Sequence, residues 1–76
     1  MNLQLRDEIV NTVNYFCRVR GWNRVHRQKI AEVISQEHKG EQGRSFATVT
    51  REMEAMTENG KQLGGLIRLG NGFYGI

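Results

Sequence analysis

The sequence predicts a small α+β fold in which three helices are followed by a C-terminal β-hairpin. Apolar residues recur at helical spacing in three separate stretches, and an Asn-Gly pair separates two apolar, β-prone runs near the end of the chain. The chain has 76 residues, of which 38% are hydrophobic. A single domain over residues 1–76, with one small core, is therefore expected.

The first helix is expected over about residues 3–20, with Gly21 as its stop because glycine accepts the left-handed conformation. Its core face is formed by apolar residues at helical spacing: Leu5, Ile9, Val13 and Phe16. A second apolar stripe is formed by Leu3, Val10 and Cys17. We expect this stripe to pack against the C-terminal strands; the alternative is a dimer seam, although three positions fall short of a sustained heptad pattern.

Trp22 is expected to cap the core, and stacking on a base is its alternative role.

The second helix is expected over about residues 27–38. Its inward residues are Ile30, Val33 and Ile34. If His26 is the N-cap, Val25 and Ile30 stand where a hydrophobic staple would place them. Arg27 and Gln28 then lie in the first turn, where free backbone N–H groups favour an anion such as a phosphate.

The third helix is expected over about residues 46–59, with Ser45 as its N-cap. Residues that recur at three- and four-residue steps are expected to face the core: Phe46, Val49, Met53 and Met56. Counting about 100° per residue, the outer face holds Arg44, Ala47, Thr48, Arg51, Glu54, Ala55 and Glu58. Because this face is cationic at its start and acidic towards its end, the helix is expected to enter a nucleic-acid groove N-terminus first.

The hairpin is expected over about residues 66–76, because both residues of Asn71-Gly72 tolerate positive φ. An isolated hairpin is marginally stable. It is therefore expected to pack on the helices or to pair with a short strand near Val25.

Three helices followed by a hairpin is the layout of a winged helix-turn-helix, and two segments resemble those of bacterial and phage regulators of that type. The run from Ser45 to Met56, closed by Gly60, is similar to their recognition helix, in which Thr-Val-x-Arg precedes hydrophobic residues and a glycine. Val25 with residues 29–34 is similar to the first helix of the motif, whose small alanine lets two helices approach closely. The resemblance covers about two-thirds of the chain. Two features depart from the pattern: the connection over residues 38–44 is longer than usual, and His26 and Lys29 replace a Ser/Thr and an acid.

The charge distribution suits a nucleic-acid partner, and a solvated charged face is the alternative reading of the same pattern. The net charge is +3, and no acid lies between Arg18 and Lys29 or after Lys61. The resemblance implies sequence-specific binding of double-stranded DNA by a small transcriptional regulator, with the third helix in the major groove and the wing on adjacent backbone.

The residues expected to contact base edges or adjoining backbone are Arg44, Thr48 and Arg51. Those expected to position the protein through phosphates or from the wing are Ser45, Thr50, Arg24, Arg27, Gln28, Arg68 and Asn71. Neutralising about four or five phosphates predicts a slope of log K against log salt near −4.

Other functions find less support in the sequence. No catalytic motif is present, so no enzyme, cofactor or small-molecule substrate is expected; His26, His38 and Cys17 lack zinc-ligand spacing. The open alternative is a winged helix used for protein–protein assembly in a replication, packaging or regulatory complex, because Glu52, Glu54 and Glu58 are awkward against DNA. A homodimer would add base contacts, and the oligomeric state stays open.

The expected location is the cytoplasm, with the protein associated with the nucleoid when bound to DNA. A single cysteine cannot close an internal disulfide, and the N-terminus becomes charged too early for a secretory signal. No apolar run reaches the roughly 20 residues that span a bilayer, so no membrane partner is expected.

Overall fold

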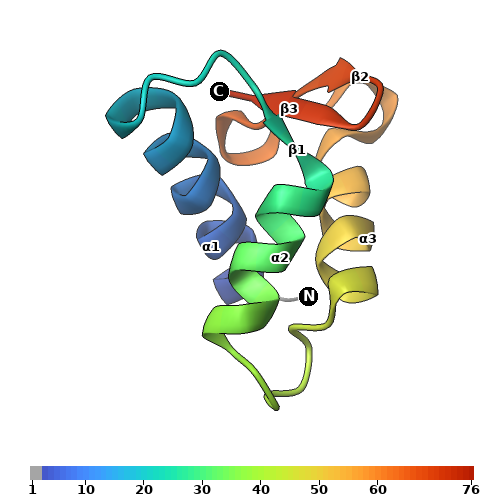
Figure 1. Ribbon diagram of the computed structural model, residues 1–76. Coiled ribbons are helices and arrows are strands. Elements are labelled where there is room, and N and C mark those ends of the chain that lie inside the picture. Colours follow the sequence, from blue (N-terminus) through green and yellow to red (C-terminus); the bar gives the residue numbers. More distant parts are fainter. Residues whose placement is uncertain (1–2) are drawn as a thin grey trace.

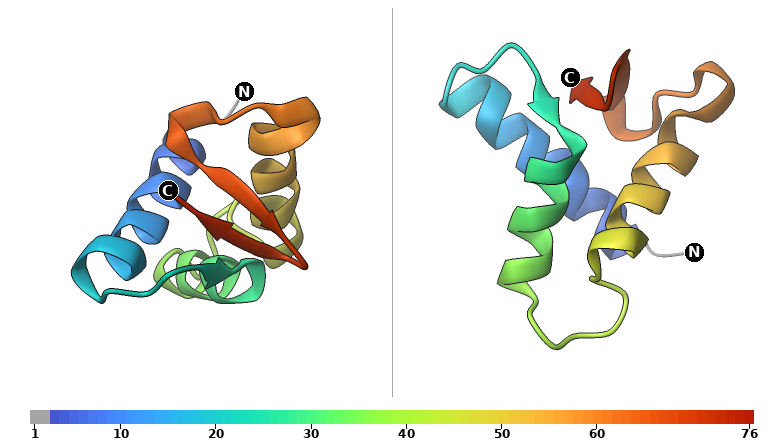
Figure 2. Two further views of the ribbon diagram at one scale, coloured as in Figure 1. Left: turned by 90° about the horizontal axis from the view of Figure 1, so that it is seen from above. Right: turned by 45° about the vertical axis from the view of Figure 1, so that its right-hand side comes forward.

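Three helices and a three-stranded antiparallel sheet make up the computed structural model, which describes residues 3–76 (Figure 1). The helices are α1 (Leu3–Asn14), α2 (Arg27–Glu37) and α3 (Phe46–Thr57). The strands are β1 (Val25–His26), β2 (Ile67–Gly70) and β3 (Phe73–Gly75). The sheet lies across one end of the helices, and α2 and α3 diverge from the connection that joins their other ends (Figure 2).

The first helix continues beyond α1 as one π-helical segment, η1 (Tyr15–Val19), so the helical run ends one residue before the expected end. Gly21 follows with φ 74°, the left-handed conformation that glycine adopts without strain. The backbone N–H of Trp22 then donates to the carbonyl of Phe16 at 2.9 Å, and the two rings stack with centroids 4.6 Å apart. Trp22 therefore covers the core beside Phe16 while its side chain stays 38% exposed.

The start of α2 and the start of α3 are each set by a side-chain cap. His26 Nδ1 accepts from the backbone N–H of Gln28 at 3.1 Å, so histidine fills the N-cap position of α2. Ser45 Oγ accepts from the N–H of Thr48 at 3.2 Å at the start of α3. The helix α3 ends at Thr57 and a 3₁₀ turn, η2 (Glu58–Gly60), follows it.

The sheet has the strand order β1-β3-β2. Of the two arrangements expected for the hairpin, pairing with a short strand near Val25 is present: Val25 pairs with Tyr74, and His26 pairs with Phe73. In the hairpin turn, Asn71 and Gly72 have φ of 53° and 81°, as the sequence pattern predicts for a tight turn. A bulge interrupts the pairing between Arg68 and Gly70.

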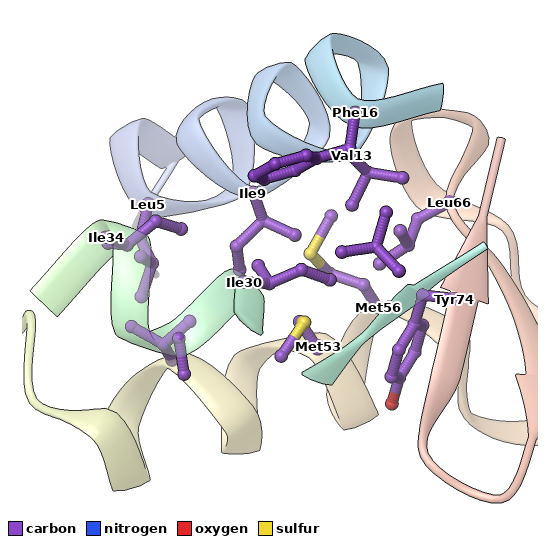
Figure 3. Close-up of a cluster of buried hydrophobic side chains, with 13 residues drawn as sticks. Leu5, Ile9, Val13, Phe16, Ile30, Ile34, Met53, Met56, Leu66 and Tyr74 are labelled. Carbon is purple, nitrogen blue, oxygen red and sulfur yellow. The ribbon is translucent and has the colours of Figure 1, made fainter. Parts of the chain in front are cut away.

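Within the described part of the chain, the core is one cluster of 13 buried residues from all three helices and the sheet (Figure 3). The expected inward residues of α1 are all in it, as are Val49, Met53 and Met56 of α3. Phe46 is not, which corrects the prediction for that residue: its side chain is 45% exposed. Its angle around the helix is within about 20° of that of the buried Met53, so the angle is not the cause. The cause is its place along the helix, because Phe46 is the first residue of α3 and borders an open hollow beside the start of α2.

The second apolar stripe of α1 meets the segment that leads into the hairpin. A Cβ added at Gly64, in the 3₁₀ turn η3 (Leu63–Gly65), would lie 2.6 Å from a methyl carbon of Val10. Val10 and Cys17 pack against the core cluster, and the side chain of Leu3 lies outside the described part of the chain.

Candidate nucleic-acid interface

A hollow of about 360 Å³ lies between the start of α2 and the first two turns of α3. Five residues line it, and we call it the α2–α3 hollow: His26, Arg27, Gln28, Phe46 and Thr50. Three of these five are residues that the sequence predicts to contact DNA. Phe46 and His26 are the additions, because the sequence pattern assigned the first to the core and gave the second only a capping role.

The tip of the β2–β3 hairpin, Asn71-Gly72, which we call the wing tip, is held at the start of α2 beside this hollow. The backbone N–H of Arg27 donates to the carbonyl oxygen of Gly72 at 2.7 Å. A Cβ at Gly72 would lie only 2.9 Å from Nε2 of His26, so the turn passes close against the histidine ring. Asn71, the residue before Gly72, is exposed.

The backbone donors at the start of α2 are already used within the protein. The N–H of Arg27 bonds to Gly72, and the N–H of Gln28 bonds to the ring of His26. This corrects the expectation that a phosphate would satisfy these two groups. A phosphate contact from Arg27 or Gln28 must therefore come from their side chains, both of which are exposed.

Two arginines flank the wing tip. The guanidinium carbon of Arg24 lies 4.2 Å from the ring centroid of Phe73 in β3, a cation–π geometry that leaves Arg24 exposed. Arg27 Nη1 lies 3.8 Å from a carboxylate oxygen of Glu54 on α3, and both side chains are about half exposed. Such an exposed pair holds its partners weakly, so Arg27 can exchange this carboxylate for a phosphate.

Arg51 lies on α3, one residue from Thr50, and is exposed. None of the ion pairs found among residues 3–76 involves its guanidinium group. Thr50 donates its hydroxyl proton back to the helix, to the carbonyls of Phe46 at 3.1 Å and Ala47 at 3.0 Å. Arg51 is therefore the predicted recognition residue with the freest side chain, and Thr50 has its donor already engaged.

Ser45 and Thr48 are both engaged in the cap of α3. Besides the bond from the Thr48 N–H, the two hydroxyl oxygens lie 2.8 Å apart. Thr48 is half-buried. The pair therefore fixes the start of α3, and a contact from either residue to DNA would use only its remaining hydrogen-bonding capacity.

Arg44 does not lie on the outer face of α3, which corrects its expected position. Its Nε lies 2.6 Å from a carboxylate oxygen of Glu8 on α1, and its side chain is only 10% exposed. The cause is local: Arg44 precedes the N-cap, so the rotation of 100° per residue does not apply to it. A contact with DNA would require Arg44 to leave Glu8.

Arg68 lies on the hairpin but its guanidinium group reaches the C-terminal end of α3. Nε donates to Thr57 Oγ1 at 3.1 Å, and Nη2 donates to the carbonyl of Glu54 at 3.2 Å. A cation is favourable there because the helix dipole places partial negative charge at the last carbonyls. Arg68 thus joins the hairpin to α3, and the bonds to its guanidinium group compete with any phosphate.

The acidic residues towards the end of α3 are only partly neutralised within the protein. Glu52 pairs with Arg6 of α1, and Glu54 faces Arg27. Glu58 is exposed in η2, beyond the end of α3. The first two turns of α3 are therefore the part of its outer surface with the least negative charge.

Comparison of the chain with protein-family models, with curated proteins and with solved structures found no match. Within residues 3–76, no helix has the length and apolar character needed to cross a bilayer. The function is therefore inferred from the α2–α3 hollow and the charged groups around it.

Proposed function

We propose that this chain is a winged helix-turn-helix protein that binds double-stranded DNA in a sequence-specific way, as a small transcriptional regulator. In this proposal the first two turns of α3 enter the major groove, and the β2–β3 wing lies on the adjacent backbone. The order of three helices and a terminal hairpin, and the small antiparallel sheet, agree with that architecture.

The observation that carries the proposal is the hydrogen bond from Arg27 to the carbonyl of Gly72. It holds the wing tip at the start of α2, and the α2–α3 hollow lies between that helix start and the first two turns of α3. Contacts from the wing tip, from the start of α2 and from α3 would then act together, and their arginines would offset the phosphate charge. These contacts are assigned to Arg24, Arg27, Gln28, Thr50, Arg51 and Asn71.

A titration of fluorescent random-sequence duplex, read by anisotropy at low and moderate salt, tests the proposal. Binding should weaken as salt rises, because counterions are released from neutralised phosphates. Arg51→Ala should weaken binding by about 1–3 kcal/mol if its guanidinium contacts a base, and by less if it contacts only a phosphate. Arg20→Ala is the matched control, since Arg20 is exposed and lines a different hollow between α1 and α2.

The second candidate is a winged helix that binds another protein. Its support is a group of exposed apolar side chains near the end of the first helix: Tyr15 at 46%, Val19 at 70% and Trp22 at 38%. Exposed apolar surface of this kind is a common feature of protein interaction sites. Absence of duplex binding at low salt, with Arg51→Ala behaving like the wild type, would favour this candidate.

A further inference from the structure

Phe46 presents an aromatic ring to solvent at the first position of α3. The ring is 45% exposed and borders the α2–α3 hollow. Phe46 is not part of the core. The buried side chains of α3 are Val49, Met53, Met56 and Thr57. An apolar ring in this position is unfavourable in water, and its contact with an apolar group of a ligand would be favourable.

The neighbours of Phe46 on the outer side of α3 are also poor in hydrogen-bond donors. Ala47 is exposed and ends in a methyl group. Thr50 donates its hydroxyl proton to the carbonyls of Phe46 and Ala47, so its methyl group is the part left for apolar contact. A ring and two methyl groups therefore form one small apolar surface, which we call the Phe46 surface and define as Phe46, Ala47 and Thr50.

The surroundings of the Phe46 surface favour a polyanion as the ligand that carries the matching apolar group. Arg51 follows Thr50 on α3, and Arg27 and Gln28 form the opposite wall of the hollow. In the major groove of DNA, the apolar group displayed by a base pair is the C5-methyl group of thymine, and small apolar side chains and phenylalanine are suited to contact it.

Stacking of an unpaired base on Phe46 fits the geometry less well. Such binding uses successive aromatic platforms. A candidate for the second platform, Phe73, is covered on one face by the Arg24 guanidinium group, and its ring meets His26 edge to face with centroids 4.9 Å apart. The second platform is thus occupied within the protein.

We propose that the Phe46 surface reads thymine through its C5-methyl group, which makes Phe46 a specificity-determining residue of the interface. This inference rests on the proposed binding of duplex DNA. In this proposal, the preference for thymine comes from apolar contact with the first turns of α3. Arg51 and Arg27 add binding affinity that does not depend on the methyl group.

A competition experiment measures this preference directly. Two random-sequence duplex pools, one made with thymine and one with deoxyuridine, carry different fluorophores and compete for limiting protein. The ratio of the two labels in the bound fraction reports the contribution of the methyl group. One buried methyl group corresponds to a preference of about four-fold for thymine, and several contacted thymines raise it further.

Phe46→Ala should lower that ratio towards one, because the ring is lost and only methyl groups remain at the surface, and Phe46→Leu should retain more of the preference because leucine keeps a larger apolar contact. Both variants should fold, since Phe46 lies outside the core, and circular dichroism melts check this. Arg51→Ala is the complementary variant: it should reduce the total amount of bound duplex and leave the ratio unchanged.

The possible failures are distinguishable. Salt-dependent binding of both pools with a ratio of one for the wild type would overturn the thymine inference and leave duplex binding in place. Absence of binding to either pool at low salt would overturn the proposed function and the inference together. Tighter binding of single-stranded thymine-rich DNA than of duplex would replace methyl reading with base stacking.

Discussion

Arg27 and Gly72, 45 residues apart in the sequence, are joined by a backbone hydrogen bond of 2.7 Å. The bond fixes the wing tip at the start of α2, beside the histidine that caps that helix. A change at the wing tip should therefore act on the helix start as well. The close fit of Gly72 against His26 gives a direct way to test this arrangement.

Gly72→Ala should destabilise the protein by about 2–3 kcal/mol. A left-handed backbone costs an L-residue about 1–2 kcal/mol, and crowding in a packed site adds about 1 kcal/mol or more. The new Cβ would lie 2.9 Å from Nε2 of His26, whose ring is held in place by its cap hydrogen bond. Urea unfolding followed by circular dichroism measures the change in free energy.

Gly60→Ala is the matched control for this substitution. Gly60 has the same φ of 81°, and a Cβ there would meet no atom within 4 Å. The difference between the two variants therefore isolates the contact with His26. Equal losses of stability would show that the wing tip does not pack against the histidine.

Arg68 should act on stability rather than on DNA affinity. Arg68→Lys keeps the charge but replaces the planar group that reaches Thr57 and the Glu54 carbonyl at once, and we expect a loss of about 1 kcal/mol. A lysine would still serve as a point charge for a phosphate. Unfolding curves and duplex titrations of the same variant separate the stabilising role of Arg68 from a role in DNA binding. Weaker DNA binding with unchanged stability would contradict the stabilising role.

Local patterns predicted the framework of this fold. Spacing placed the core residues of α1, and Asn71-Gly72 specified the hairpin because few residues tolerate two successive positive φ values. The strand near Val25 followed from the need of a lone hairpin for a partner. Each of these predictions depends on periodicity or on backbone conformation, both of which a sequence expresses directly.

The partners of the long polar side chains could not be predicted in this way. Arg44 meets Glu8 and Arg68 meets Thr57, and both pairs depend on how separate elements pack. Phe46 shows the limit of periodicity itself. Its spacing from Val49 and Met53 suits a core position, but periodicity does not show that the first residue of the helix borders an open hollow, where the ring stays in solvent.

Arg44→Ala should destabilise the protein by about 1 kcal/mol, because the substitution removes the cation beside Oε2 of Glu8 and leaves His38 beside the other carboxylate oxygen. Lys39→Ala, an exposed cation in the same connection, is the control and should change stability by less than about 0.5 kcal/mol. Thermal and urea unfolding provide the measurement. If Arg44→Ala instead reduced DNA affinity without changing stability, Arg44 would be a DNA-contacting residue.

The salt dependence of DNA binding should be weaker than the sequence alone predicts. Arg44 and Arg68 are engaged with Glu8 and with the end of α3, so Arg24, Arg27 and Arg51 remain as the arginines available among the predicted contacts. Neutralising about three phosphates gives a slope of log K against log salt near −3, in place of −4.

Arg51→Ala should make the slope shallower by about one unit if its guanidinium neutralises a phosphate, and should leave the slope nearly unchanged if it reads only a base edge. A wild-type slope of −4 or steeper would mean that Arg44 or Arg68 leaves its intramolecular partner on binding, and repeating the titration with Arg44→Ala and Arg68→Ala would identify which of them does so.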